Sequence, residues 1–298
     1  MKYFPLNPAP GFDLALAKTC GRLLDHAYGA IRQWSSMRPQ QRRNFVWKKP
    51  DATIDGLTYS DILLGELTTR RTRQRGGQRR TVSWKISYPL AFVAYDHKRA
   101  FVVIRGTSLT NEWTQVNAQF PQTPLRYGNI GFGNVHRGFK RYYETIRQEL
   151  HQVLDPLVSG RELIVTGHSL GGGVGAIALV DCWVRYRQQA ANLTSYTFAA
   201  PRIGDLAYCQ ALAQRDVDLH RVVNTEDLVP DLPPANFGSK DYRHYGIATP
   251  FTAHYETVAN CHNTPACIYA LDHPDAPETD RAAFKAWAKK QGLVQQPS

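Results

Sequence analysis

The sequence of 298 residues is poor in cysteine, with five scattered examples: Cys20, Cys182, Cys209, Cys261 and Cys267. A chain of this length that depended on a disulfide framework would need many more, so that class of protein is excluded. The short gap between Cys261 and Cys267 leaves one bridge geometrically feasible. No C-x-x-C pair and no Cys/His spacing typical of a structural metal site occurs, so we expect no metal.

A long hydrophobic run is also missing. The N-terminal 34 residues have no apolar core of a Sec signal peptide, because Asp13, Lys18, Arg22 and Asp25 interrupt them. No other stretch is long enough to span a membrane. We expect a soluble protein that is cytoplasmic, exported by a route other than Sec, or written without its leader.

Acidic residues are absent from one segment, RRTRQRGGQRR at 70–80, within a chain of formal charge +11. One interpretation is a solvated hairpin tip around Gly76 and Gly77. The other is a patch that attracts anionic surfaces, among which phospholipid and acidic polysaccharide are better candidates than nucleic acid. Six arginines would form that patch: Arg70, Arg71, Arg73, Arg75, Arg79 and Arg80.

The apolar residues that are present, 43% of the chain, alternate between strand-like and helix-like patterns. A helix is predicted over 13–34 with Asp13 as its N-cap, and another helical pattern over 135–154. Short buried strands are predicted at 90–96, 100–106, 162–167, 194–200 and 220–225, with helices over 174–189 and 205–215. This alternation predicts an α/β protein with a mostly parallel sheet covered by helices on both faces.

No internal repeat or linker divides the chain, so a single domain over 1–298 is predicted. Within it we expect an N-terminal helical region over 1–35 and a C-terminal helix and tail over 279–298.

Ser169 lies in Gly167-His168-Ser169-Leu170-Gly171, which satisfies G-x-S-x-G. A predicted strand enters this segment and a predicted helix leaves it, which is the context of a nucleophile elbow. The alternative is a plain strand-to-helix junction. A serine hydroxyl needs a general base to remove its proton and a carboxylate to orient that base.

On such a fold the acid and the histidine follow the serine in that order. Asp227 comes just after a predicted strand, at the sheet edge where such sites are built. Glu226 and Asp231 are competing carboxylates. Spacing alone does not choose among the downstream histidines, which are His244, His254, His262 and His273.

Five motifs in order resemble the class 3 lipases, the group of the filamentous-fungal triacylglycerol lipases and their bacterial relatives. They are FVVIRGT (101–107), VHRGF (135–139), IVTGHSLGG (164–172), TFAAPRIGD (197–205) and RVVNTEDLVPDLP (221–233). The resemblance covers roughly residues 90–270 and implies an α/β-hydrolase fold with carboxylic ester hydrolysis. It aligns Ser169 with the nucleophile and Asp227 with the triad acid.

The histidine departs from the fungal pattern, because only 35 positions separate Asp227 from His262. The segment CHNTPACIYAL (261–271) is similar to a bacterial variant in which a short helix follows the histidine. The resemblance thus favours His262 as the general base and gives His244 a structural position. His254 and His273 remain alternatives.

The resemblance also implies the groups that would bind the oxyanion. The N–H after the nucleophile belongs to Leu170, and Thr107 matches the family's small hydroxyl residue after Arg-Gly. The following segment, 108–120, matches the lid, and Trp113 matches an aromatic that meets lipid. Thr107 could instead be a turn residue, Arg105 a structural ion-pair partner, and 108–120 a plain surface helix.

These features together predict a serine ester hydrolase for lipid esters that needs no metal or organic cofactor. Triacylglycerol lipase-like activity is the leading hypothesis, and phospholipase A1-type and feruloyl-type esterases are alternatives. A hypothesis of another class is a basic, non-catalytic relative that binds anionic surfaces.

Overall fold

The structure is a computed structural model that describes residues 5–51, 56–75, 78–108, 112, 121–253 and 258–275. Within these ranges the side chains of residues 69–75, 78–80 and 258 are left out of the description. Of the predicted lid over 108–120, only residues 108 and 112 are described, so Trp113 lies outside. His254 and the predicted C-terminal helix over 279–298 also lie outside the described residues.

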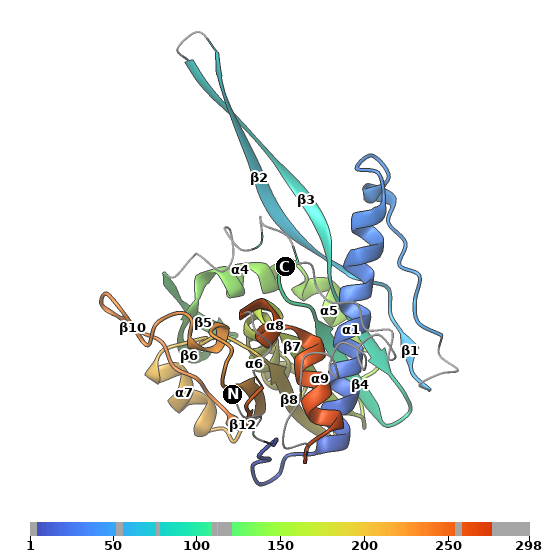
Figure 1. Ribbon diagram of the computed structural model, residues 1–298, viewed down its shortest axis with the longest axis vertical. Helices are drawn as coiled ribbons and strands as arrows, with labels where there is room; N and C mark the ends of the chain where they lie inside the picture. The colour runs from blue at the N-terminus through green and yellow to red at the C-terminus, as the bar shows by residue number, and fades with distance from the viewer. Residues whose placement is uncertain are drawn as a thin grey trace.

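A central sheet organises the molecule (Figure 1). Its strand order is β1-β3-β4-β7-β8-β9-β12, and β2 pairs with β3. The strands are β1 (Thr58–Tyr59), β2 (Leu63–Arg75), β3 (Gln78–Tyr95), β4 (Arg99–Ile104), β7 (Glu162–His168), β8 (Asn192–Phe198), β9 (Asp218–Asn224) and β12 (Ile247–Phe251). From β4 to β12 all neighbours are parallel, whereas β1, β2 and β3 pair antiparallel. The predicted mostly parallel sheet is therefore confirmed.

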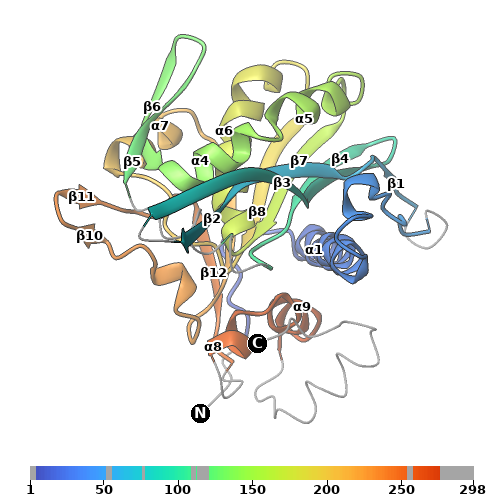
Figure 2. The same cartoon turned by 90° about the horizontal axis from the view of Figure 1, so that it is seen from above.

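The central strands contribute side chains to two separate apolar cores. Along β4, Val102 and Ile104 join one core, and Phe101 and Val103 join the other. Such alternation with full burial on both sides requires a cover on each face of the sheet. Figure 2 shows these covers as two layers of helices, and so confirms the predicted arrangement.

One layer contains α4 (Arg137–Glu144), α5 (Arg147–Leu154), α6 (Leu170–Tyr186) and α7 (Leu206–Ala213). The other contains α1 (Leu14–Ser36), α8 (Val258–His262) and α9 (Thr264–Asp272). Two small hairpins, β5 (Gln122–Tyr127) with β6 (Ile130–His136) and β10 (Asn236–Phe237) with β11 (Lys240–Asp241), lie outside the main sheet. Two short 3-10 helices, Arg42–Asn44 and Val229–Asp231, complete the described elements.

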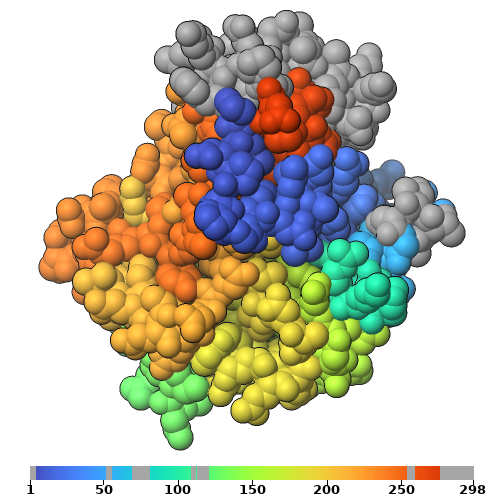
Figure 3. All heavy atoms as spheres, turned by 90° about the horizontal axis from the view of Figure 1, so that it is seen from below, coloured from blue at the N-terminus to red at the C-terminus, as the bar shows by residue number. Residues whose placement is uncertain are grey.

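The N-terminal helix forms as the sequence predicts. The Asp13 side chain caps it by accepting a hydrogen bond of 3.0 Å from the Leu16 N–H, which satisfies one of the free donors of the first turn. The apolar positions from Ala17 to Trp34 that define its periodicity are all buried. Figure 3 shows this helix, in blue, beside the red α9, so segments from opposite ends of the described chain share one layer.

The helical pattern over 135–154 does not form one helix. It divides into α4 and α5, and β6 extends to His136. At the break the Thr145 hydroxyl donates to the Tyr142 carbonyl at 2.7 Å and accepts from the Glu66 N–H of β2 at 3.2 Å. A threonine that bonds a backbone carbonyl competes with the helix, and here the strand stabilises that alternative.

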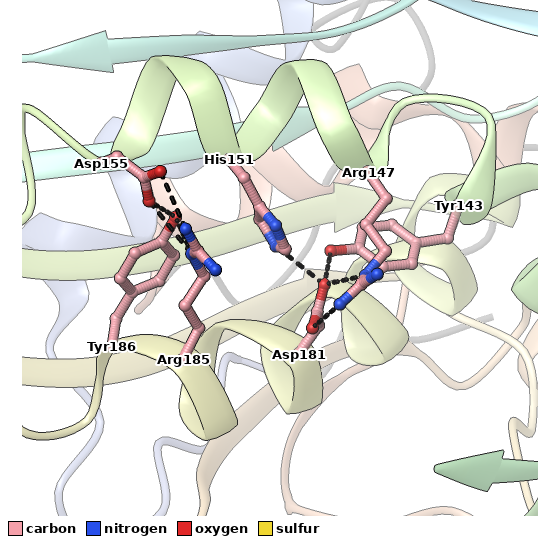
Figure 4. A network of polar contacts seen from close by, with 7 residues as sticks. All are labelled: Tyr143, Arg147, His151, Asp155, Asp181, Arg185 and Tyr186. Atoms are coloured by element: carbon pink, nitrogen blue, oxygen red, sulfur yellow. Dashed lines mark hydrogen bonds and ion pairs between the residues drawn. The ribbon is translucent and has the colours of Figure 1, made fainter. Parts of the chain in front are cut away.

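A buried carboxylate on α6 holds α5 in place (Figure 4). Asp181 is 1% exposed and accepts hydrogen bonds from Tyr143 at 2.6 Å and from Arg147 at 2.7 and 3.0 Å. His151 Nε2 lies 2.9 Å from the same carboxylate. Burial would raise the pKa of Asp181, but the hydrogen bonds from these three side chains lower it to about 2.

The strands β2 and β3 form a long hairpin that extends away from the rest of the molecule (Figure 1). Their antiparallel pairing continues to Arg75 and Gln78, and the predicted tip at Gly76 and Gly77 lies outside the described residues. On the described part of β3, Val82 is 53% and Trp84 is 42% exposed. The ribbon therefore carries apolar side chains into solvent.

The five cysteines are all free thiols, so Cys261 and Cys267 do not form the feasible bridge. Both are buried. In the part of the chain that the structure describes, no helix has the length and apolar character needed to cross a membrane.

Candidate active site

Ser169 lies at the turn where β7 ends and α6 begins. Its backbone has φ 56° and ψ −129°, a conformation that residues with a side chain rarely adopt. Among the described residues, Ser169 is one of three non-glycine residues with a positive φ. A strained backbone conformation between a strand and a helix is typical of a nucleophile elbow.

The glycines on either side of Ser169 are required because backbone segments approach each other closely at this turn. A Cβ on Gly167 would lie 2.1 Å from the Gly171 carbonyl oxygen. A Cβ on Gly171 would lie 2.3 Å from the carbonyl oxygens of both Ile104 and Arg105. Backbone atoms cannot rotate away, so any larger residue would open the turn. The G-x-S-x-G pattern thus follows from packing between β4, β7 and α6.

Three side chains from distant parts of the sequence meet at this turn. His262 Nε2 lies 2.7 Å from Ser169 Oγ, and His262 Nδ1 lies 2.7 Å from Asp227 Oδ2. A carboxylate only accepts hydrogen bonds, so Nδ1 donates to Asp227 and Nε2 is left to accept the serine proton. Asp227 is 3% exposed, and its second oxygen accepts the Val229 N–H at 2.9 Å.

The competing histidines lie elsewhere in the described structure. His244 Nε2 donates to the Pro230 carbonyl at 2.8 Å, and burial lowers the pKa of its imidazole to about 4. His273 stacks on Tyr269 with ring centroids 4.2 Å apart, near the end of α9. The helix that the sequence predicts after His262 is present as α9.

The competing carboxylates also have other surroundings. Asp231 forms an ion pair of 2.7 Å with Arg202, and its side chain is 73% exposed. Glu226 precedes Asp227 in the same turn, and its N–H donates to the Asn224 side chain at 3.3 Å. Only Asp227 among the three has a hydrogen bond to His262 in the described contacts.

Two backbone segments lie next to Ser169. Leu170 is the first residue of α6, so its N–H has no acceptor within the helix and lies at the positive end of the helix dipole. Thr107 follows Gly106, whose Cβ position would lie only 2.8 Å from the Ser169 Cβ. The loop after β4 therefore packs directly on the elbow.

A buried ion pair anchors this loop. Arg105 and Glu112 are both 0% exposed, and their charged atoms lie 2.7 and 3.0 Å apart. Glu112 also accepts hydrogen bonds from the Ser108 N–H at 2.8 Å and the Tyr142 hydroxyl at 2.8 Å. The structural ion-pair role that the sequence analysis considered for Arg105 is thus the observed one.

Three further residues at the site were not identified from the sequence. Asn224 is fully buried and donates to the Ala253 and Cys261 carbonyls at 2.8 and 3.1 Å. His168 and Tyr28 form a buried hydrogen bond of 2.6 Å beside the elbow. Asn224 and His168 lie inside motifs, whereas Tyr28 is 140 positions away from its partner and no local signal marks it.

Comparison with known proteins places this geometry in context. The family model "Lipase (class 3)" matches residues 101–237. A lipase of Rhizomucor miehei is 34% identical over 145 residues, which cover 47% of this chain and 39% of that protein. A "Secreted mono- and diacylglycerol lipase 1" of Fusarium solani is 30% identical over 159 residues, which cover 52% of this chain and 45% of that protein. The chain thus spans less than half the length of these relatives.

The fold agrees with solved lipase structures. The Rhizomucor miehei lipase propeptide complex matches with a TM-score of 0.56 and 24% identity, over 83% of this chain and 70% of that chain. The likeness in architecture establishes the α/β-hydrolase fold that the motifs imply.

Proposed function

We propose that this chain, whose residues 101–237 match the class 3 lipase family model, is a serine hydrolase that cleaves carboxylic esters of lipids. The observation that carries this proposal is the pair of 2.7 Å contacts from His262, one to Ser169 and one to Asp227. This is the arrangement that nucleophilic acyl transfer needs: a hydroxyl, a base within reach of its proton, and a carboxylate that orients the base.

In the proposed reaction Ser169 Oγ attacks the acyl carbonyl while its proton passes to His262 Nε2. The tetrahedral oxyanion accepts hydrogen bonds from the N–H of Leu170 and from Thr107. The protonated His262 then gives its proton to the departing alcohol, and an acyl-enzyme remains. Water attacks this ester with His262 again as base, and the carboxylic acid leaves.

The substrate we propose is an acylglycerol, as for a triacylglycerol lipase. Support comes from the Rhizomucor miehei and Fusarium solani relatives, one named as a lipase and the other as a mono- and diacylglycerol lipase. Phospholipase A1-type and feruloyl-type activities are the alternatives. Trioctanoin, dioctanoylglycerol, a diacyl phosphatidylcholine and methyl ferulate assayed side by side should give the highest kcat/KM on an acylglycerol. Preference for the phospholipid or the ferulate would replace the proposed substrate and keep the reaction.

The catalytic roles are tested by single substitutions on a soluble p-nitrophenyl ester. Ser169→Ala should lower kcat by about 10⁴-fold or more, because a triad member is lost. His262→Ala should be equally damaging, whereas His254→Ala and His273→Ala should be mild. Asp227→Asn should also lower kcat strongly, since it spoils the tautomer and orientation of the base.

A fluorophosphonate probe separates the proposed enzyme from a non-catalytic relative. The wild type and a Ser159→Ala control, which changes an exposed serine, should label to one equivalent. Ser169→Ala should not label. A wild type that neither labels nor hydrolyses any ester would favour the non-catalytic hypothesis. Full activity of His262→Ala would remove this histidine from the mechanism.

We further propose that the β2/β3 hairpin attaches the protein to anionic phospholipid. Six arginines and no acid occur in residues 70–80, and the paired strands carry this segment away from the body of the molecule. The exposed Val82 and Trp84 lie on the same ribbon and supply apolar surface for the interface. Each arginine near a negative membrane contributes about 1 kcal/mol, and salt screens this attraction over roughly 8 to 10 Å.

Replacing all six arginines by glutamine tests this attachment. Binding to phosphatidylglycerol vesicles at low salt should weaken strongly, binding to phosphatidylcholine vesicles should change little, and hydrolysis of a soluble short-chain ester should stay near that of the wild type. Equal binding of both proteins to phosphatidylglycerol would make the segment a plain solvated hairpin. A large loss on the soluble ester would instead put it at the mouth of the active site.

A further inference from the structure

The residue before the proposed nucleophile is a fully buried histidine that takes no part in the proposed reaction. His168 Nδ1 lies 2.6 Å from the Tyr28 hydroxyl, and His168 Nε2 lies 2.7 Å from the main-chain carbonyl of His262. Its ring centroid is 4.8 Å from that of His262. A buried imidazole with a partner on each nitrogen connects two parts of the site.

The direction of these hydrogen bonds follows from the chemistry of the partners. A carbonyl oxygen only accepts, so His168 Nε2 carries a proton and donates to His262. Burial, and then the neighbouring His262, lower the pKa of His168 well below its ordinary value, so the ring is neutral. Nδ1 of a neutral ring with a proton on Nε2 is an acceptor, and the Tyr28 hydroxyl must therefore donate to it.

The Tyr28 oxygen also accepts a hydrogen bond of 3.0 Å from the Gly106 N–H. A directed chain thus runs from the Gly106 N–H through the Tyr28 hydroxyl and the His168 ring to the His262 carbonyl. It joins α1, the loop after β4, the end of β7 and the end of α8. The loop after β4 continues into Thr107, the proposed oxyanion residue, and the chain ends on the proposed base.

We propose that Tyr28 is a positioning residue that fixes the oxyanion loop and the His262 main chain in their places relative to Ser169. This inference rests on the proposed function. Tyr28 fits the role because it comes from α1, a long helix packed in both apolar cores, and so gives both loops a fixed reference. A Cβ on Gly106 would lie 2.4 Å from the Tyr28 oxygen, so the loop and the hydroxyl are in direct contact.

The main chain at His262 is held by Asn224 as well as by His168. Asn224 donates to the Cys261 carbonyl at 3.1 Å, so two consecutive carbonyls before and at the base are fixed by buried side chains. Asn224 comes from β9 and holds the base from the side of the acid. His168, supported by Tyr28, holds it from the side of the nucleophile. Loss of either anchor leaves the imidazole free to shift relative to Ser169.

Tyr28→Phe keeps the aromatic ring and removes only the hydroxyl. The Gly106 N–H then loses its acceptor and His168 Nδ1 loses its donor, so the oxyanion loop and the His262 main chain can both move. A displacement near 1 Å in such a site costs about 10²-fold in rate, and we expect kcat on a soluble p-nitrophenyl ester to fall roughly 10- to 100-fold. KM should stay within about twofold, because Tyr28 is not proposed to touch the substrate.

Tyr143→Phe is the matched control. Tyr143 of α4 is also buried, and its hydroxyl donates an equally short hydrogen bond of 2.6 Å, but to Asp181 of α6. Both variants should lose stability, and only Tyr28→Phe should lose kcat and react more slowly with the fluorophosphonate. A Tyr28→Phe variant that matches Tyr143→Phe in both kcat and thermal midpoint would overturn the proposal.

A second pair of variants keeps the test decisive if Tyr28→Phe does not fold. The amide of His168→Gln can accept from Tyr28 and donate to His262, whereas the side chain of His168→Leu can do neither. We expect His168→Gln to retain at least tenfold more kcat than His168→Leu. Equal kcat in the two would refute the positioning role. An inactive wild type that also fails to label would refute the proposed function and this inference with it.

Discussion

Replacing Glu112 by glutamine should destabilise the protein strongly, because the Arg105 guanidinium would stay charged and unpaired in a fully buried position. The two side chains form a pair with two contacts, at 2.7 and 3.0 Å, and neither is exposed. Glu112 also accepts from Ser108 and Tyr142, so its two oxygens serve three donor groups. A glutamine has a single acceptor oxygen and turns an NH₂ group toward donors.

The expected magnitude follows from this burial. Removing one partner of a buried ion pair costs about 3–5 kcal/mol in the free energy of unfolding, because the remaining charge is unpaired. For a chain of this size that loss lowers the thermal midpoint by roughly 6 to 20 °C. The loop from Arg105 to Ser108 loses its anchor as well, so ester turnover should fall together with stability.

The assay is urea unfolding at pH 7 followed by circular dichroism, with the free energy taken at an unchanged m-value. Glu66→Gln is the control. Its ion pair with Lys85 has the same 2.7 Å distance, but the two side chains are 40% and 70% exposed. An exposed pair contributes about 0–1 kcal/mol, so this variant should unfold almost as the wild type does. If Glu112→Gln costs no more than Glu66→Gln, the argument from burial is refuted.

Two other substitutions test the packing of the fold. The pKa of Asp181 is lowered to about 2 from an ordinary value of 3.8, so its contribution of about 2 kcal/mol is present above pH 4 and is lost as the pH falls toward 2. Asp181→Asn should therefore lose about that much at pH 7, and its deficit should shrink toward pH 2 in acid unfolding; a deficit independent of pH would contradict the assignment. Gly171→Ala should abolish fluorophosphonate labelling and lower the thermal midpoint, because its Cβ would meet two backbone carbonyls at 2.3 Å; wild-type labelling would show that the turn can relax.

The features that were predicted from the sequence depend on interactions between residues close together along the chain. The periodicity of α1, its Asp13 cap and the buried strand before Ser169 are local, since each depends on residues a few positions apart. The same holds for the glycines of the elbow, where a strand, a tight turn and a helix follow one another directly. These features were predicted, and they account for the mostly parallel sheet and the location of Ser169 on it.

The helical pattern over 135–154 is present as α4 and α5, but an interaction from outside that segment interrupts it. Thr145 interrupts the helix because its hydroxyl accepts a hydrogen bond from Glu66, which lies 79 positions earlier on β2. The periodicity on both sides of the break is genuine and gives α4 and α5. A pattern read along the chain contains no information about a donor that approaches from another element.

The site shows the same limit. The sequence by itself located Ser169, through the elbow, and proposed Asp227, through a strand end. Only the tertiary structure decided which histidine lies 2.7 Å from Ser169 and which tyrosine reaches His168, because those pairs are separated by 93 and 140 positions. The tertiary structure also determined that Arg105 is buried in an ion pair with Glu112. Spacing does not encode such contacts, since the folding of the sheet and its two helical layers, rather than any local preference, brings the partners together.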